Sequence, residues 1–305
     1  MTKTTKTTTP PARVTHIFAN SPIDGQLYSA IDRFLNDGCP DRVVLSLVTA
    51  EGNARDAFRI GEMMQARTSE LMIHVPGVCR SVGTLLACAG HRVLFALDAE
   101  FGPLSVRTTR QNESGVWRDA RWSQLAIEGL CNQAIELQAS MAQTIVSRYR
   151  GAVDYREAAQ LAGNVLNGIM SPLVSQLNVG EICDDYIELR AAEEYALQLA
   201  RGSGGNIDAE GVKRLMYGFP ASDFYLDAFD DQHRWFRRMD LAWDALEHSL
   251  RNFHKYPRAP LSAEDRIIFK EIIDAPDDDE LSNPDFDPGE NILNWDYRIG
   301  APAGE

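Results

Sequence analysis

Apolar positions in the first hundred residues alternate between short strand-like runs and helical spacings. A strand-like run at 14–19 precedes apolar residues at helical spacing from Leu27 to Leu35, and a run at 43–48 precedes a helical pattern over 54–67. Further strands are expected at 71–75 and 93–96, with a short apolar helix at 81–89 between them. Because parallel strands need crossover connections, this alternation predicts an α/β layered domain with largely parallel pairing.

The pattern changes to longer helices in the second half of the chain. Apolar residues from Leu130 to Ile145 recur at spacings of 4, 3, 4 and 4, which predicts a long amphipathic helix over about 122–149 that can pack on a sheet or a partner subunit. The Gly-Ser-rich stretch 202–206 is typical of a linker, and helices are expected at about 207–217 and 222–254. The expected organisation is a disordered tail at 1–12, an α/β domain at 13–201, a helical C-terminal region at 207–273 and an acidic extended tail at 274–305.

Composition and charge narrow the class of partner. The 305 residues include 30 basic and 44 acidic side chains, a net charge of −14, which disfavours nucleic acid and anionic lipid as partners. No run approaches the roughly 18 apolar residues of a membrane span, and no apolar stretch opens the chain as a signal sequence would. Five cysteines without a CxxC pair favour reduced thiols and a cytoplasmic location.

Two turns place backbone amides where a developing anion could sit. The first is Glu51-Gly52-Asn53, and the second is Arg80-Ser81-Val82-Gly83, which opens the short helix at 81–89. The unpaired amides and the dipole at a helix N-terminus favour negative charge, so a serine at this position has help in stabilising an oxyanion. The plain alternative is that Ser81 only caps the helix.

The run from Thr15 to Ala99 resembles the Clp protease proteolytic subunit within the Clp/crotonase superfamily, and resembles the serine dehydrogenase proteinase-like proteins still more. Gly52 matches the second glycine of the family's Gly-Gly turn, and the segment 81–87 resembles its Ser-x-Gly nucleophile motif. The segments that also carry the resemblance, over about residues 14–200, are Ser21-Pro22-Ile23-Asp24 and Glu100-Phe101-Gly102-Pro103-Leu104.

The resemblance implies a repeated ββα core with serine peptidase chemistry on a peptide or protein substrate. Ser81 would be the nucleophile, and the amides of Gly52 and Val82 would hold the tetrahedral oxyanion, an interaction worth about 2.7–4 kcal/mol in the transition state. No cofactor and no metal ion is implied, and self-association through the long helix at 122–149 and the hairpin near residue 112 is expected.

The general base that a serine nucleophile needs is missing from its family position. The Clp histidine would fall close to Pro103, and residues 7–212 contain no lysine for the Ser-Lys alternative. His91 would lie about 15 Å from Ser81 along a helix, and we interpret His74 and His16 as structural residues. In the serine dehydrogenase proteinase relatives an Asp stands where this chain has Ser105.

Three functional readings therefore stay open. The first is an active Clp-like serine peptidase whose base comes from elsewhere, such as another subunit. The second is a catalytically inactive scaffold that keeps the fold and the oxyanion turns. The third and lowest-ranked is a crotonase-type acyl-CoA enzyme, for which Glu100 is the nearest candidate acid.

A cluster of arginines and tryptophans surrounds an expected hairpin turn at 112–115. It is either a groove for an acidic peptide or partner, or a solvated arginine-rich hairpin. The aromatic-rich helix expected at 223–254 suits docking rather than metal binding, because His248 and His254 are not on one helix face. The residues of the cluster are Arg107, Arg110, Trp117, Arg118, Arg121 and Trp122.

Overall fold

The structure is a computed structural model, and it describes residues 13–38, 41–97, 99–109, 117–149, 152–219, 221, 224–226, 235–242 and 259–274. The expectations for the tail at 1–12, the hairpin turn at 112–115 and the acidic segment after 274 lie outside the described residues. The same holds for Arg110 and for the histidines at 233, 248 and 254.

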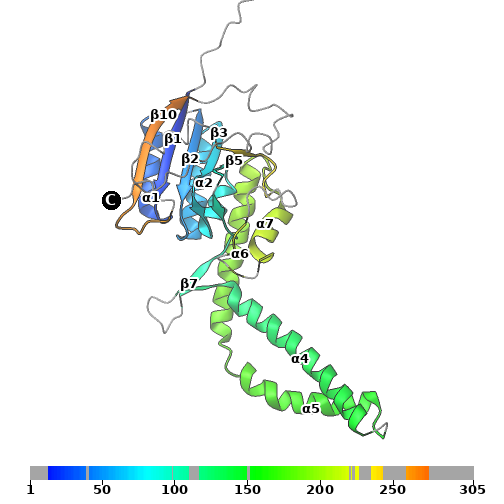
Figure 1. The fold of residues 1–305 in the computed structure, drawn as a ribbon. Helices are drawn as coiled ribbons and strands as arrows, with labels where there is room; N and C mark the ends of the chain where they lie inside the picture. Colours follow the sequence, from blue (N-terminus) through cyan, green and yellow to red (C-terminus); the bar gives the residue numbers. More distant parts are fainter. Residues whose placement is uncertain are drawn as a thin grey trace, which may run out of the picture.

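A six-stranded sheet forms the centre of the molecule (Figure 1), in the order β10-β1-β2-β3-β5-β9. All neighbouring strands pair in parallel except β10, which pairs antiparallel with β1 along one edge. The mostly parallel α/β sheet expected from the sequence is therefore confirmed. Its strands are β1 (Arg13–Asn20), β2 (Arg42–Val48), β3 (Glu70–Val75), β5 (Arg92–Phe95), β9 (Met239–Leu241) and β10 (Ile267–Asp274).

A second set of short parallel pairings continues each central strand beyond its carboxyl end. Ile23 bridges Gly52, Thr49 bridges Cys79, and β4 (Val78–Cys79) pairs with β6 (Glu100–Phe101). Along the chain, a long strand, a short second-layer segment and a helix therefore recur. This repeat matches the ββα core that the resemblance implied.

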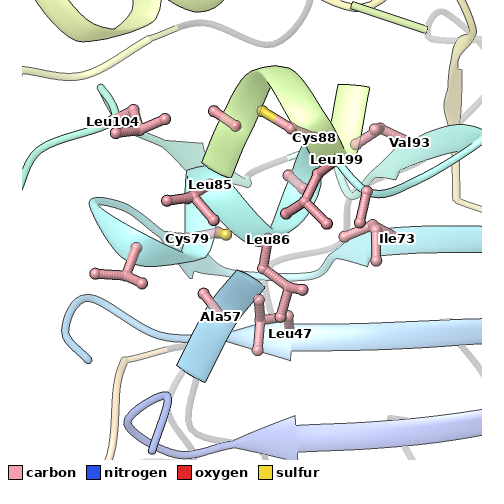
Figure 2. Close-up of a cluster of buried hydrophobic side chains, with 14 of the residues drawn as sticks. Leu47, Ala57, Ile73, Cys79, Leu85, Leu86, Cys88, Val93, Leu104 and Leu199 are labelled. Carbon is pink, nitrogen blue, oxygen red and sulfur yellow. The ribbon is translucent and has the colours of Figure 1, made fainter. Parts of the chain in front are cut away.

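The main hydrophobic core lies between one face of the sheet and the helices that cover it. The amphipathic spacing of α1 and α2 places their apolar stripes on the sheet, and each helix is capped by a side chain, Asp24 for α1 and Asn53 for α2. Figure 2 shows Leu85 and Leu86 of α3 in one apolar cluster with Leu47 and Ile73 of the strands and Leu199 of α6. The helices are α1 (Gly25–Asn36), α2 (Ala54–Arg67), α3 (Val82–Ala87), α4 (Arg121–Arg148), α5 (Tyr155–Val174), α6 (Val179–Gly202) and α7 (Ala209–Tyr217).

Helices α4 and α5 form an arm that stands away from the sheet (Figure 1). They pack on each other through a separate small cluster centred on Ala142, Ala158 and Ala162, and α6 returns from the arm to the body. The strands β7 (Arg107–Thr109) and β8 (Trp117–Asp119) form the expected hairpin at the base of the arm. Within the described ranges, no helix is long and apolar enough to cross a membrane.

The C-terminal region differs from the helical expectation. The described part of 222–254 contains no helix, and residues 239–241 instead form β9 because they pair with β5 at the sheet edge. Residues 267–274 form β10 rather than part of a helical region. Nor is the stretch 202–206 an exposed linker, because Ser203 is buried and the Asn206 side chain donates to Gly90 and accepts from the Arg238 amide. The domain boundaries themselves stay a prediction.

Candidate active site

Ser81 has a strained backbone at the point where the chain enters α3. Its φ of 58° and ψ of −118° make it the one non-glycine residue with positive φ in the described part of the chain. Such a conformation costs about 1–3 kcal/mol and persists only where surrounding contacts enforce it. Here the Ser81 amide donates to the carbonyl of Pro103, and the Ser81 carbonyl accepts from Thr84.

The Ser81 hydroxyl does not cap α3, so the plain capping interpretation is wrong. The helix has no side-chain cap hydrogen bond at Ser81. The hydroxyl donates instead to the backbone carbonyl of Ser105, at 2.7 Å, and Ser81 is only 2% exposed. The segment 102–105 therefore lies over the hydroxyl, held also by a bond from Thr84 Oγ1 to the Gly102 carbonyl.

Gly52 lies in the turn after β2, and no other residue fits there. Its φ is 153°, and a Cβ added to it would meet both the Cβ and the carbonyl oxygen of Ile23 at 2.6 Å. The close approach follows from the second-layer bridge between Gly52 and Ile23. Asn53, the next residue, begins α2 by accepting hydrogen bonds from the amides of Arg55 and Asp56.

Backbone pairing brings the Gly52 turn and the Ser81 turn side by side. The Thr49 amide donates to the Val78 carbonyl, and the Arg80 amide donates to the Thr49 carbonyl, at 2.8 and 3.0 Å. A Cβ on Gly83 would lie 2.6 Å from Thr49 Cγ2, so glycine is required for this contact.

Two amides in these adjacent turns have no hydrogen-bond acceptor among the described residues. Considering acceptors within the described residues only, neither Gly52 N–H nor Val82 N–H donates a hydrogen bond. Val82 is the first residue of α3, where an intrahelical partner is not expected.

The structural interpretation of His16 and His74 agrees with their positions in the sheet. Ser46 Oγ lies 2.7 Å from both His16 Nε2 and His74 Nδ1, and His16 Nδ1 lies 2.8 Å from Glu271 Oε1. Both rings are fully buried. These side chains alternate with the residues of the main core along their strands, so they belong to the opposite face of the sheet from α3.

The other candidate bases do not reach Ser81 either. His91 accepts from the Leu71 amide at the start of β3, whereas Ser81 follows the end of that strand, which lies about 13 Å farther along. Lys270 donates to the Phe34 carbonyl, and Lys213 is exposed on α7. In the described part of the chain, the Ser81 hydroxyl has no histidine, lysine or carboxylate partner.

The arginines around the site are paired with carboxylates, which weakens the interpretation of a cationic groove. Arg80 contacts Glu100 at 2.6 Å, and Arg107 contacts Glu51, beside Gly52, at 3.3 Å. The remaining described pairs are Arg118 with Glu181 and Asp185, and Arg121 with Asp119. The hairpin is thus joined to the Gly52 turn and to α6 by ion pairs.

The two thiols near the Ser81 turn are unsuited to act as nucleophiles. Cys79 and Cys88 are fully buried, and burial raises the pKa of each thiol to about 12. The thiolate is the reactive form of cysteine, so both remain protonated at neutral pH. Both are free cysteines, as the absence of a CxxC pair predicted.

No protein family model and no curated protein matches the chain. Among solved structures, it is similar to a serine-to-alanine mutant of the 1510-N membrane-bound stomatin-specific protease, at 12% identity and a TM-score of 0.43 over 82% of this chain and 90% of that chain. It is also similar to a lysine-to-alanine mutant of that protease in complex with a substrate peptide, at 19% identity and a TM-score of 0.31 over 43% and 59%. Because these identities and TM-scores are low, the function proposed below rests on this chain's own residues.

Ser81, Gly52 and Val82, the three residues that the resemblance selected, lie on two turns that are joined by backbone pairing through Thr49. Sequence reasoning missed the Ser105 carbonyl as the partner of the Ser81 hydroxyl, because a backbone contact 24 residues away leaves no motif. It also missed buried Asp185, which accepts hydrogen bonds from Thr108 and Ser123 and pairs with Arg118. Asp185 stands among other charged residues of α6, so the sequence pattern did not indicate that its side chain is buried.

Proposed function

We propose that the chain is a Clp-like serine peptidase that acts on a peptide or protein substrate by acyl transfer. Ser81 is the nucleophile, and the Gly52 and Val82 amides stabilise the oxyanion. The observation that carries the proposal is the positive φ of Ser81, a cost with no capping function, beside two amides without an acceptor in the described residues. Strain of this kind clusters at active sites.

In the proposed reaction, Ser81 Oγ attacks the substrate carbonyl carbon while its proton passes to a base from outside the described residues, which then protonates the leaving amine. The carbonyl oxygen gains negative charge and accepts hydrogen bonds from the two amides. Collapse of the tetrahedral intermediate releases the amine, and water then hydrolyses the acyl-serine. Before attack, the Ser81 hydroxyl has to break its hydrogen bond to the Ser105 carbonyl, because the proton that it donates there has to pass to the base instead.

The second candidate function is an inactive scaffold with the same fold. It is favoured by the contact of the Ser81 hydroxyl with a backbone carbonyl rather than with a base. The crotonase-type alternative has less support, because its candidate acid Glu100 is paired with Arg80. A CoA ester should therefore leave the melting temperature unchanged.

Labelling with a fluorophosphonate probe tests the peptidase proposal. We expect the wild-type protein to be labelled and Ser81→Ala to lose labelling completely, because the probe reacts only with an activated serine. Ser203→Ala is the matched control, since Ser203 is also buried and also donates to a backbone carbonyl, that of Ala200 at 2.9 Å. Labelling is followed on the intact protein by mass spectrometry.

The outcomes separate the two candidates. Labelling that depends on Ser81 and not on Ser203 would exclude the inactive scaffold. A wild-type protein that stays unlabelled in every oligomeric state would contradict the peptidase proposal.

We also propose that the chain forms a homo-oligomer and is cytoplasmic, with the buried free thiols of Cys79 and Cys88 in support of a reducing location.

A further inference from the structure

Helix α5 carries an apolar ridge on a surface that the rest of the chain leaves exposed. Its Ala158, Ala162 and Leu166 are buried toward α4 and the arm's interior. A neighbouring ridge has the same four-residue spacing, and each of its four residues is 44% to 53% exposed. Its members are Leu161, Val165, Ile169 and Leu173. A helix that is apolar on most sides is normally buried by another element.

The exposed ridge borders a hollow of about 670 Å³ between α4, α5 and the start of α6. Its lining is apolar and includes Leu130, Leu166 and Met170. Val174 lies at the hollow and is itself 53% exposed. Ridge and hollow together form one apolar surface along the arm, far from the sheet in Figure 1. Contiguous apolar surface of this kind marks an interaction site.

The charges of the arm identify the kind of partner. Residues 121–174 contain four arginines and four acids, a net charge of zero, and residues 158–180 contain no charged side chain, in a chain of net charge −14. Helices that lie on a lipid surface usually carry lysines and arginines on their polar face, and α5 has only Arg156 near its start. Two arms of this chain can meet without the repulsion that the rest of the protein would generate.

We infer that the α5 ridge is the contact through which two copies of this chain associate. Ridges at four-residue spacing interdigitate with their own kind at a crossing angle of about −50°, so the ridge is complementary to itself under a two-fold axis. Gly168, three residues after Val165, supplies a hole beside the ridge, since nothing lies within 4 Å of a Cβ added there. This contact is the interface of the homo-oligomer proposed above, and it does not depend on peptidase chemistry.

Two variants test the surface by sedimentation velocity over a range of protein concentrations. Gly168→Leu fills the hole, while leucine has the higher helix propensity, so the monomer keeps its fold. Ile169→Glu places a charge in the ridge. We expect a wild-type dimer and at least about tenfold weaker dimerisation in each variant. Circular dichroism and the melting curve report the fold independently.

Each variant has a matched control. Gly129→Leu makes the same exchange on α4, where a Cβ also meets nothing within 4 Å, and Ile272→Glu adds the same charge at an exposed position of β10. Both controls should dimerise like the wild type. A monomeric wild-type protein, a dimer broken only by Ile272→Glu, or an arm that binds phosphatidylcholine vesicles without self-association would each overturn the inference. Loss of the dimer with Ser81 labelling unchanged would leave the peptidase proposal standing.

Discussion

Gly52 and Gly38 share an unusual backbone angle but have different surroundings. Their φ values are 153° and 152°. A Cβ on Gly52 would lie 2.6 Å from two atoms of Ile23, whereas nothing lies within 4 Å of one on Gly38. The two positions therefore separate the cost of the backbone angle from the cost of the steric clash.

We expect Gly52→Ala to lower the free energy of unfolding by about 3 kcal/mol, because strain of about 1–3 kcal/mol adds to overpacking of similar size. Gly38→Ala should cost about 1 kcal/mol from the angle alone. Urea unfolding measures both. If Gly52 is an oxyanion donor, its displacement should also slow labelling of Ser81 by about a hundredfold. Equal unfolding losses at the two positions would contradict the role of the Ile23 contact.

At the scale of elements, one buried carboxylate joins the hairpin to the helices. Asp185 of α6 is 1% exposed, accepts from Thr108 Oγ1 of β7 at 2.8 Å and pairs with Arg118 of β8 at 2.7 Å. The Ser123 hydroxyl of α4 donates to it as well. Three elements thus depend on one side chain for their relative positions.

We expect Asp185→Ala to lower the free energy of unfolding by about 1–3 kcal/mol, because the Thr108 and Ser123 hydroxyls lose their buried acceptor and Arg118 keeps only Glu181 as a partner. A double-mutant cycle with Arg118→Ala should give a coupling energy of about 1–3 kcal/mol. The control cycle uses Arg201 and Glu194, which are 71% and 53% exposed and 3.8 Å apart, and should show no measurable coupling. Similar coupling in both cycles would contradict the anchoring role.

At the scale of the whole molecule, a polar chain crosses four adjacent strands of the sheet. Glu271 of β10, His16 of β1, Ser46 of β2 and His74 of β3 are linked by successive contacts of 2.7–2.8 Å. It connects the first described strand with the last, 255 residues away in sequence. Burial, followed by the charge of His16, lowers the pKa of His74 to about 3.

This pKa predicts how stability changes with pH. The unfolded chain binds a proton at His74 near pH 6.5, whereas the folded protein does so only near pH 3, so stability is full above about pH 6.5 and is lost as pH falls toward 3. His74→Gln should remove about 1.4 kcal/mol per pH unit from the slope within this window. Denaturant unfolding at several pH values measures it. Identical slopes for the two proteins would contradict the prediction.

Local patterns accounted for most of the α/β unit. The helix expected at 54–67 coincides with α2, and the expected strands lie within a residue or two of β1, β2, β3 and β5. The C-terminal strands were missed, because β9 and β10 are strands only by virtue of pairing with β5 and β1. Their residues carry no periodicity that identifies such distant partners.

The sequence by itself located the two turns of the candidate site, because a glycine-containing turn after a strand-like run and a serine at the start of a short apolar helix are local signals. It also established that no lysine between residues 7 and 212 can serve as a base. Only the tertiary structure decided what those residues contact: Ser81 donates to the Ser105 carbonyl, and Arg107 and Arg118 of the hairpin are paired with carboxylates. Such contacts depend on segments that meet in space, and spacing along a chain does not encode them.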